Sequence, residues 1–129
     1  MQSVNNSPGE LLILIVSGDV ATGQLLKFGL ESVGRVHVTT TTDGADAITL
    51  LSSARYRIVI LALPVVASFV LLDDMVRRSD PAPVILIIDS EERPPQRPYP
   101  SNVKRLLTKP IRIPHLKGFI QDIDRASGR

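Results

Sequence analysis

The chain has 129 residues, of which 43% are hydrophobic and 22% are charged, a balance typical of one globular domain with a single core. Cysteine is absent, which excludes disulfides and thiolate metal sites. The two histidines, His37 and His115, lack the paired spacing of a zinc site, so no metal site is expected. The formal net charge of +2 is unevenly distributed: residues 1–92 carry −5 and residues 93–129 carry +7.

Apolar periodicity predicts strands that alternate with helices along the chain. Three runs are aliphatic on both faces and too short for helices, which is typical of strands buried on both sides of a parallel sheet. The five expected strands cover residues 11–16, 35–39, 57–63, 84–88 and 104–108. The expected helices cover residues 20–33, 45–54, 65–78 and 114–125.

One connection breaks this alternation. Residues 90–102 include Pro94, Pro95, Pro98 and Pro100, and prolines at this density remove amide donors and block helix propagation. We therefore expect the fourth helix of the alternation to be shortened or missing. Right-handed crossovers then predict a flavodoxin-like, doubly wound α/β fold with five parallel strands in the order 2-1-3-4-5. The predicted domain covers residues 11–126, with a flexible segment at 1–10 and a tail at 127–129.

The segment 58–72 is the longest apolar run, but Pro64 and Ser68 interrupt it. It is shorter than the ~20 residues that cross a bilayer, so we expect no membrane span. The first ten residues are polar and lack the pattern of a signal peptide. These observations favour a cytoplasmic protein.

Several motifs occur in the order that a known family shows. They are Ile13-Leu14-Ile15-Val16, Asp43-Gly44-Ala45-Asp46-Ala47, Ile58-Val59-Ile60-Leu61, Ala82-Pro83-Val84-Ile85 and Leu107-Thr108-Lys109-Pro110-Ile111. Over nearly its whole length the chain thus resembles the receiver domain of bacterial response regulators. The resemblance implies a two-component signal-transduction or phosphorelay protein. It also implies a cis peptide bond between Lys109 and Pro110.

The resemblance assigns five chemical groups to the strand ends, and this chain departs from most of them. Receivers place an acidic pair, which holds magnesium, where this chain has Ser17 and Gly18. They place the phosphate-accepting aspartate at Ala62 and a hydroxyl residue at Ile88. Only Lys109 matches, and the aromatic switch position is Leu106.

These replacements remove the expected chemistry. Magnesium requires anionic oxygen ligands, and phosphoryl transfer requires a nucleophile, which an alanine methyl cannot supply. No strand end carries a nucleophile paired with a base, so we expect neither an enzyme nor a cofactor. The chain is therefore interpreted as a degenerate receiver, or pseudo-receiver, that works independently of phosphorylation.

Lys109 needs either water or a carboxylate, because an unpaired buried ammonium is costly. Asp89 and Asp19 are the nearest acids by topology, although Asp19 could simply cap the helix that follows it. Pairing of Lys109 with one of these acids and full exposure to solvent both remain open.

Two features predict a surface for a protein partner. Apolar residues after Pro64 cannot all face the sheet at helical spacing, although some must pack there. The basic last third could attract an acidic partner or support a homodimer. The candidate surface residues are Val65, Val66, Phe69, Lys104, Arg105 and Arg112.

The preferred hypothesis is a receiver-like module that binds a protein partner without being phosphorylated. One alternative is the receiver half of a longer two-component regulator, in which a separate output domain would bind nucleic acid. Another is a small-molecule sensor that uses the emptied site as its pocket.

Overall fold

The computed structural model of the protein describes residues 10–32, 35–78, 82–93 and 97–126. A five-stranded parallel sheet forms its centre, in the order β2-β1-β3-β4-β5, which confirms the predicted flavodoxin-like topology. The strands are β1 (Leu11–Ser17), β2 (Val36–Thr41), β3 (Ile58–Ala62), β4 (Val84–Ile88) and β5 (Val103–Thr108). Apart from Glu10, the predicted flexible segment at 1–10 and the tail at 127–129 lie outside the described residues.

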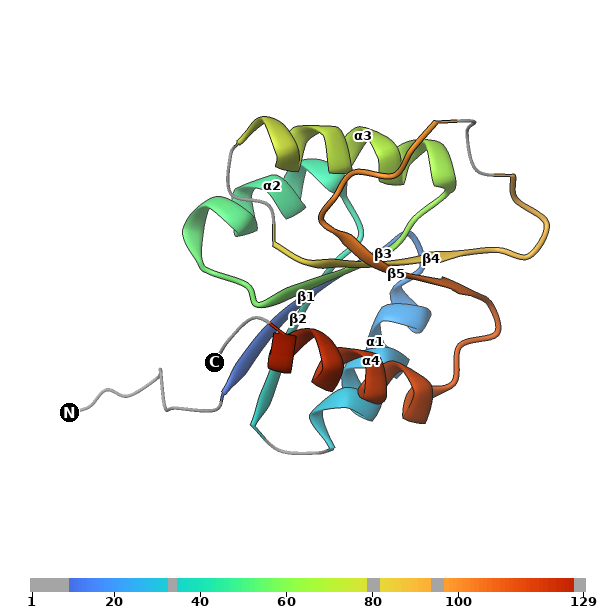
Figure 1. Cartoon of the computed structure of the whole chain (residues 1–129). Coiled ribbons are helices and arrows are strands. Elements are labelled where there is room, and N and C mark those ends of the chain that lie inside the picture. Colours follow the sequence, from blue (N-terminus) through green and yellow to red (C-terminus); the bar gives the residue numbers. More distant parts are fainter. Residues whose placement is uncertain (1–9, 33–34, 79–81, 94–96, 127–129) are drawn as a thin grey trace.

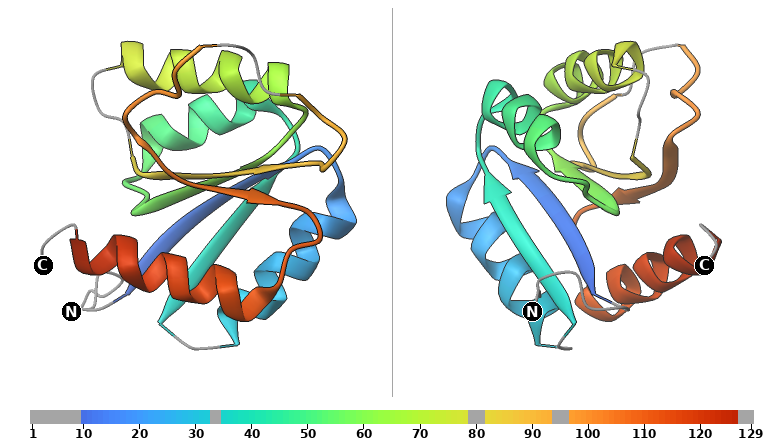
Figure 2. Two further views of the ribbon diagram at one scale, coloured as in Figure 1. Left: turned by 45° about the vertical axis from the view of Figure 1, so that its right-hand side comes forward. Right: turned by 90° about the vertical axis from the view of Figure 1, so that its left-hand side faces the viewer.

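Four helices cover the sheet in two layers. They are α1 (Val20–Glu31), α2 (Gly44–Ser53), α3 (Val65–Arg77) and α4 (Ile113–Ala126). Helices α2 and α3 lie on one face of the sheet, and α1 and α4 lie on the other (Figures 1 and 2). Within the described residues, no helix is both long and apolar enough to span a bilayer.

The alternating side chains of each central strand divide between two cores. In β1, Leu14 and Val16 belong to the core under α2 and α3, whereas Ile13 and Ile15 belong to the core under α1 and α4. Neighbouring residues of a strand point to opposite faces of the sheet, so an aliphatic run supplies both cores at once. This arrangement explains why β1, β3 and β4 read as continuous apolar segments.

The connection from β4 to β5 contains no helix in its described parts, residues 89–93 and 97–102, in agreement with the prediction from the prolines. Pro94 and Pro95 themselves lie outside the described residues. The later part of the connection contacts α3: the ring of Tyr99 packs 5.5 Å from that of Phe69. The guanidinium of Arg97 lies 4.6 Å above the same Phe69 ring and pairs with Asp73 at 3.2 Å.

Candidate functional site

The candidate site lies at the carboxyl ends of the strands, where doubly wound α/β proteins place their binding residues. Strand pairing sets Ser17 opposite Ala62, and Ile88 opposite Thr108. The backbone amide of Lys109 donates to the carbonyl of Ile88 at 3.0 Å. The sheet therefore brings together the strand-end residues that the sequence analysis selected.

The end of β1 is occupied by a local hydrogen-bonded turn. The buried Ser17 hydroxyl donates to the Asp19 carbonyl at 2.9 Å and accepts from the Asp19 amide at 3.2 Å. The Asp19 carboxylate caps α1 by accepting from the Ala21 amide at 3.1 Å and from the Thr22 hydroxyl at 2.7 Å. The Thr22 hydroxyl above all, and then the Ala21 amide, hold the pKa of Asp19 below its usual value, with a smaller contribution from the charge of Lys109.

The ends of β3 and β4 present apolar groups. Ala62 and Ile88 are both buried, and each contributes to one of the two cores. Neither side chain offers an oxygen or nitrogen atom to a ligand. In the described part of the chain, no group of three or more histidines and acidic residues is placed to hold a metal ion.

Lys109 pairs with Asp89, one of the two acids considered for it. Its Nζ atom lies 3.2 Å from Asp89 Oδ1. The pair also has access to water, since the Lys109 and Asp89 side chains are 40% and 56% exposed. The flexible stem of lysine lets the ammonium reach water from the edge of the sheet. The peptide bond between Lys109 and Pro110 is cis, as the resemblance implied.

The candidate partner surface is only partly exposed. Val65 and Phe69 are each 4% exposed, so their assignment to a surface is wrong, whereas Val66 is 77% exposed. Val65 and Phe69 are separated by about one helical turn and both face the sheet, which turns Val66 outward. Among the basic candidates, Lys104, Arg105 and Arg112 are all exposed.

The basic residues at the start of β5 contact neighbouring groups. The Arg105 guanidinium lies 5.3 Å from the centre of the Phe119 ring and 3.9 Å from Asp122. The Lys104 ammonium donates to the Ser101 carbonyl at 3.1 Å. Leu106, at the aromatic switch position, is exposed on the same strand.

Glu92 is a site residue that the sequence analysis missed. Its Oε2 atom accepts from the Val65 amide at 2.9 Å, and its Oε1 atom accepts from the Asp89 amide at 3.2 Å. The carboxylate thus connects the start of α3 with the turn that follows β4. The spacing Asp89-x-x-Glu92 is the pattern of a capping box, and this signal could have identified the contact to Asp89.

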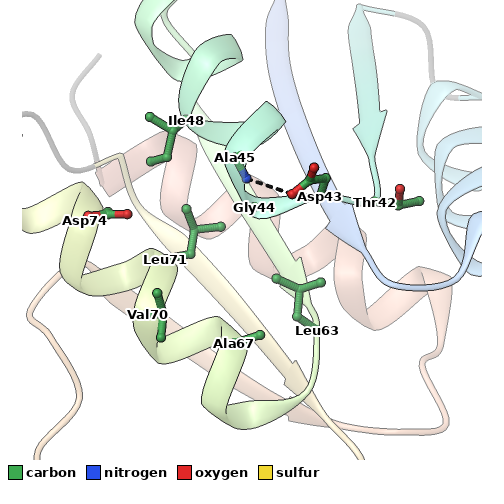
Figure 3. A pocket seen from close by; sticks show the side chains of 10 residues that line it. All are labelled: Thr42, Asp43, Gly44, Ala45, Ile48, Leu63, Ala67, Val70, Leu71 and Asp74. Atoms are coloured by element: carbon green, nitrogen blue, oxygen red, sulfur yellow. Dashed lines mark hydrogen bonds between the residues drawn. The ribbon is translucent and has the colours of Figure 1, made fainter.

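A cavity of about 540 Å³ lies beside these strand ends, between the start of α2 and one side of α3 (Figure 3). Its walls are mainly apolar, with Asp43 and Asp74 among the polar residues. Asp43 also caps α2 through the Ala45 amide at 2.9 Å. The cavity is lined by Thr42, Asp43, Gly44, Ala45, Ile48, Leu63, Ala67, Val70, Leu71 and Asp74.

No protein-family model and no curated protein matches the sequence. Solved structures do match the fold. The receiver domain of the Francisella response regulator 1452 superposes with a TM-score of 0.73 at 17% identity, covering 92% of this chain and 99% of that chain. The signal receiver domain of a signal transduction histidine kinase from Syntrophus aciditrophicus gives 0.73 at 21% identity and covers 92% of each chain.

The chemotaxis protein CheY4 of Vibrio cholerae gives a TM-score of 0.72 at 20% identity, covering 88% of this chain and 98% of that chain. These proteins share with the present chain the five parallel strands in the order 2-1-3-4-5 and the helices between them. The chain therefore has the fold of response-regulator receiver domains.

Proposed function

We propose that this chain is a receiver-like signal-transduction module that binds a protein partner and is not phosphorylated. The observation that carries the proposal is Ala62, which ends β3 as a buried methyl group. A phosphate acceptor at this position would need a carboxylate oxygen as nucleophile. Ile88, which ends the neighbouring strand β4, is also buried, so neither strand end offers a polar side chain.

The end of β1 supports the same proposal. Magnesium binds through carboxylates and other hard oxygen ligands. The Ser17 hydroxyl is already engaged with the backbone of Asp19, and Gly18 has no side chain. The nearest acid, Asp19, uses its oxygens to cap α1 and to accept from Thr22. These residues are arranged as a helix start and not as a set of metal ligands.

Exposed apolar side chains support an interaction role. Val66 and Val70 lie on the outward side of α3, and Val20, Leu25 and Phe28 lie on the outward side of α1. Partner surfaces are typically apolar patches bordered by polar residues. The basic residues Lys104, Arg105 and Arg112 would favour an acidic partner in the cytoplasm. With this role the module acts neither as an enzyme nor as a direct nucleic-acid binder.

The test is treatment with acetyl phosphate, and separately with beryllofluoride, in the presence of magnesium. We expect the intact mass to stay unchanged and the amide NMR spectrum to show no shifts clustered at the strand ends. A receiver domain whose third strand ends in aspartate serves as the positive control in the same reagents. An acyl-phosphate adduct on any carboxylate of this chain, or saturable beryllofluoride shifts around Ala62, would contradict the proposal.

A further inference from the structure

The Glu92 carboxylate bridges two elements that are far apart in the sequence. Its two oxygen atoms accept from two different backbone amides, those of Val65 and Asp89. Val65 is the first residue of α3, and Glu92 follows it by 27 residues. Asp89 directly follows β4. One side chain therefore connects a helix start with a strand exit.

The local half of this bridge closes a turn between Asp89 and Glu92 through two hydrogen bonds. The Glu92 amide donates to the Asp89 carbonyl at 3.1 Å, and the Asp89 amide donates to Glu92 Oε1 at 3.2 Å. The second of these bonds is one half of a capping box, a motif that begins many helices. In the other half, the Glu92 amide is bound by the Asp89 carbonyl and not by the Asp89 carboxylate, which pairs with Lys109. Pro94 and Pro95 follow in the sequence and oppose a helix here. Half of a capping box is thus present where the described residues 89–93 contain a turn and no helix.

The distant half of the bridge supplies a cap that α3 lacks locally. The N-cap residue of α3 is Pro64, which makes no side-chain capping bond. The first amides of a helix have no partner within it, and a negative charge near them is favourable. Glu92 Oε2 meets this need at 2.9 Å from the Val65 amide. The connection after β4 therefore provides the cap for a helix that follows β3.

We propose that Glu92 is a tethered carboxylate that locks the β4–β5 connection onto the start of α3. The contacts continue from Asp89 to Lys109, because the Asp89 Oδ1 atom lies 3.2 Å from the Lys109 Nζ atom. One connected set of contacts therefore joins the start of α3, the end of β4 and the end of β5. It holds the exposed Val66 in a fixed position relative to the strand ends. This inference goes beyond the proposed function, because these contacts are made by the chain itself whether or not the site accepts phosphate.

Amide hydrogen exchange measured by NMR tests the lock in Glu92→Ala. We expect the Val65 and Asp89 amides to exchange together at least about tenfold faster, because each loses a hydrogen bond to a charged acceptor. The matched control is Glu91→Ala, which removes an exposed neighbour with the same charge and should leave both rates within about twofold. Unchanged rates in Glu92→Ala, a change at only one of the two amides, or an equal effect of Glu91→Ala would overturn the proposal.

A measurement on the unmodified protein covers the case in which Glu92→Ala does not fold. A scalar coupling across the hydrogen bond, between the Val65 amide nitrogen and the side-chain carboxyl carbon of Glu92, reports the long-range contact directly. Its detection supports the lock. A sharp Val65 amide signal without that coupling would overturn it.

Discussion

The ion pair between Lys109 and Asp89 can be tested by a double-mutant cycle on the free energy of unfolding. The variants are Lys109→Met, Asp89→Asn and the double substitution. Each change removes one charge and nearly preserves the side-chain volume. The Asp89 amide is untouched by the substitution, so its hydrogen bond to Glu92 is retained. The coupling energy then reports the interaction between the two charged groups.

The exposure of the pair sets the expected magnitude. The two charged atoms are 3.2 Å apart, but the side chains are 40% and 56% exposed. Breaking a buried pair typically costs about 3–5 kcal/mol, whereas exposed pairs give coupling energies of about 0.2–1 kcal/mol. Water screens both charges here, so we expect a coupling of about 0.5 kcal/mol.

Urea unfolding followed by circular dichroism, at low salt and in 1 M salt, measures this coupling. It should fall toward zero in 1 M salt, where the Debye length is about 3 Å. The control cycle pairs Lys104→Met with Asp89→Asn. Lys104 lies near the opposite end of β5, about 16 Å along the strand from Lys109. The effects of Lys104→Met and Asp89→Asn on the free energy of unfolding should therefore be additive. A coupling energy above about 2 kcal/mol that persists in 1 M salt would refute the reasoning from exposure. Strict additivity of the two substitutions at low salt would show that the ion pair does not contribute to stability.

Two further predictions concern the core and the helix start. Leu86→Ala, at a fully buried position of β4, should cost about 2–5 kcal/mol of unfolding free energy. Leu106→Ala, at an exposed position of β5, should cost less than about 1 kcal/mol by the same urea measurement; similar losses at both positions would contradict the placement of β5. The Asp19 carboxyl should titrate below the usual aspartate range, because Thr22 and Ala21 hydrogen-bond its ionised form. Its stabilising contribution is present at neutral pH, persists above the pKa of the unfolded chain, and is lost as the pH falls through the lowered folded pKa. NMR titration that gives Asp19 an ordinary or raised pKa would disprove this assignment.

Much of the fold is readable from the sequence because burial on both faces leaves a distinct pattern. The runs 58–62 and 84–88 contain only aliphatic residues, and such runs are typical of strands that are covered on both faces in a parallel sheet. The prolines after β4 likewise predict the loss of the fourth helix from their chemistry alone. Each of these signals is local, so a single sequence is enough to detect it.

The orientation of α3 was harder to predict. The sequence shows that the apolar residues after Pro64 cannot all face inward, but not which of them do. Contact with the sheet decides how the helix is rotated about its axis, so that Val65 and Phe69 face inward and Val66 faces outward. The spacing of four between Val65 and Phe69 is consistent with one inward-facing side. An equally regular spacing links Val66 and Val70, so spacing alone leaves the choice open.

The sequence leaves open whether Lys109 reaches water or pairs with an acid, because strand-end topology says nothing about how far a long side chain reaches. The ammonium extends to the surface and meets Asp89 there. A buried, unpaired lysine would carry a large desolvation cost, whereas a half-buried lysine with its own carboxylate does not.

Of the two contacts that Glu92 makes, only the local one could be predicted from the sequence. The contact from Glu92 to Asp89 follows from three-residue spacing, whereas the contact to Val65 requires β3 and β4 to be neighbours first. Once they are, the start of α3 offers an amide that no local side chain caps. The carboxylate of Glu92 satisfies it, and Asp89 pairs with Lys109 nearby. Glu92, Asp89 and Lys109 thus each find a partner within the chain at this edge of the sheet.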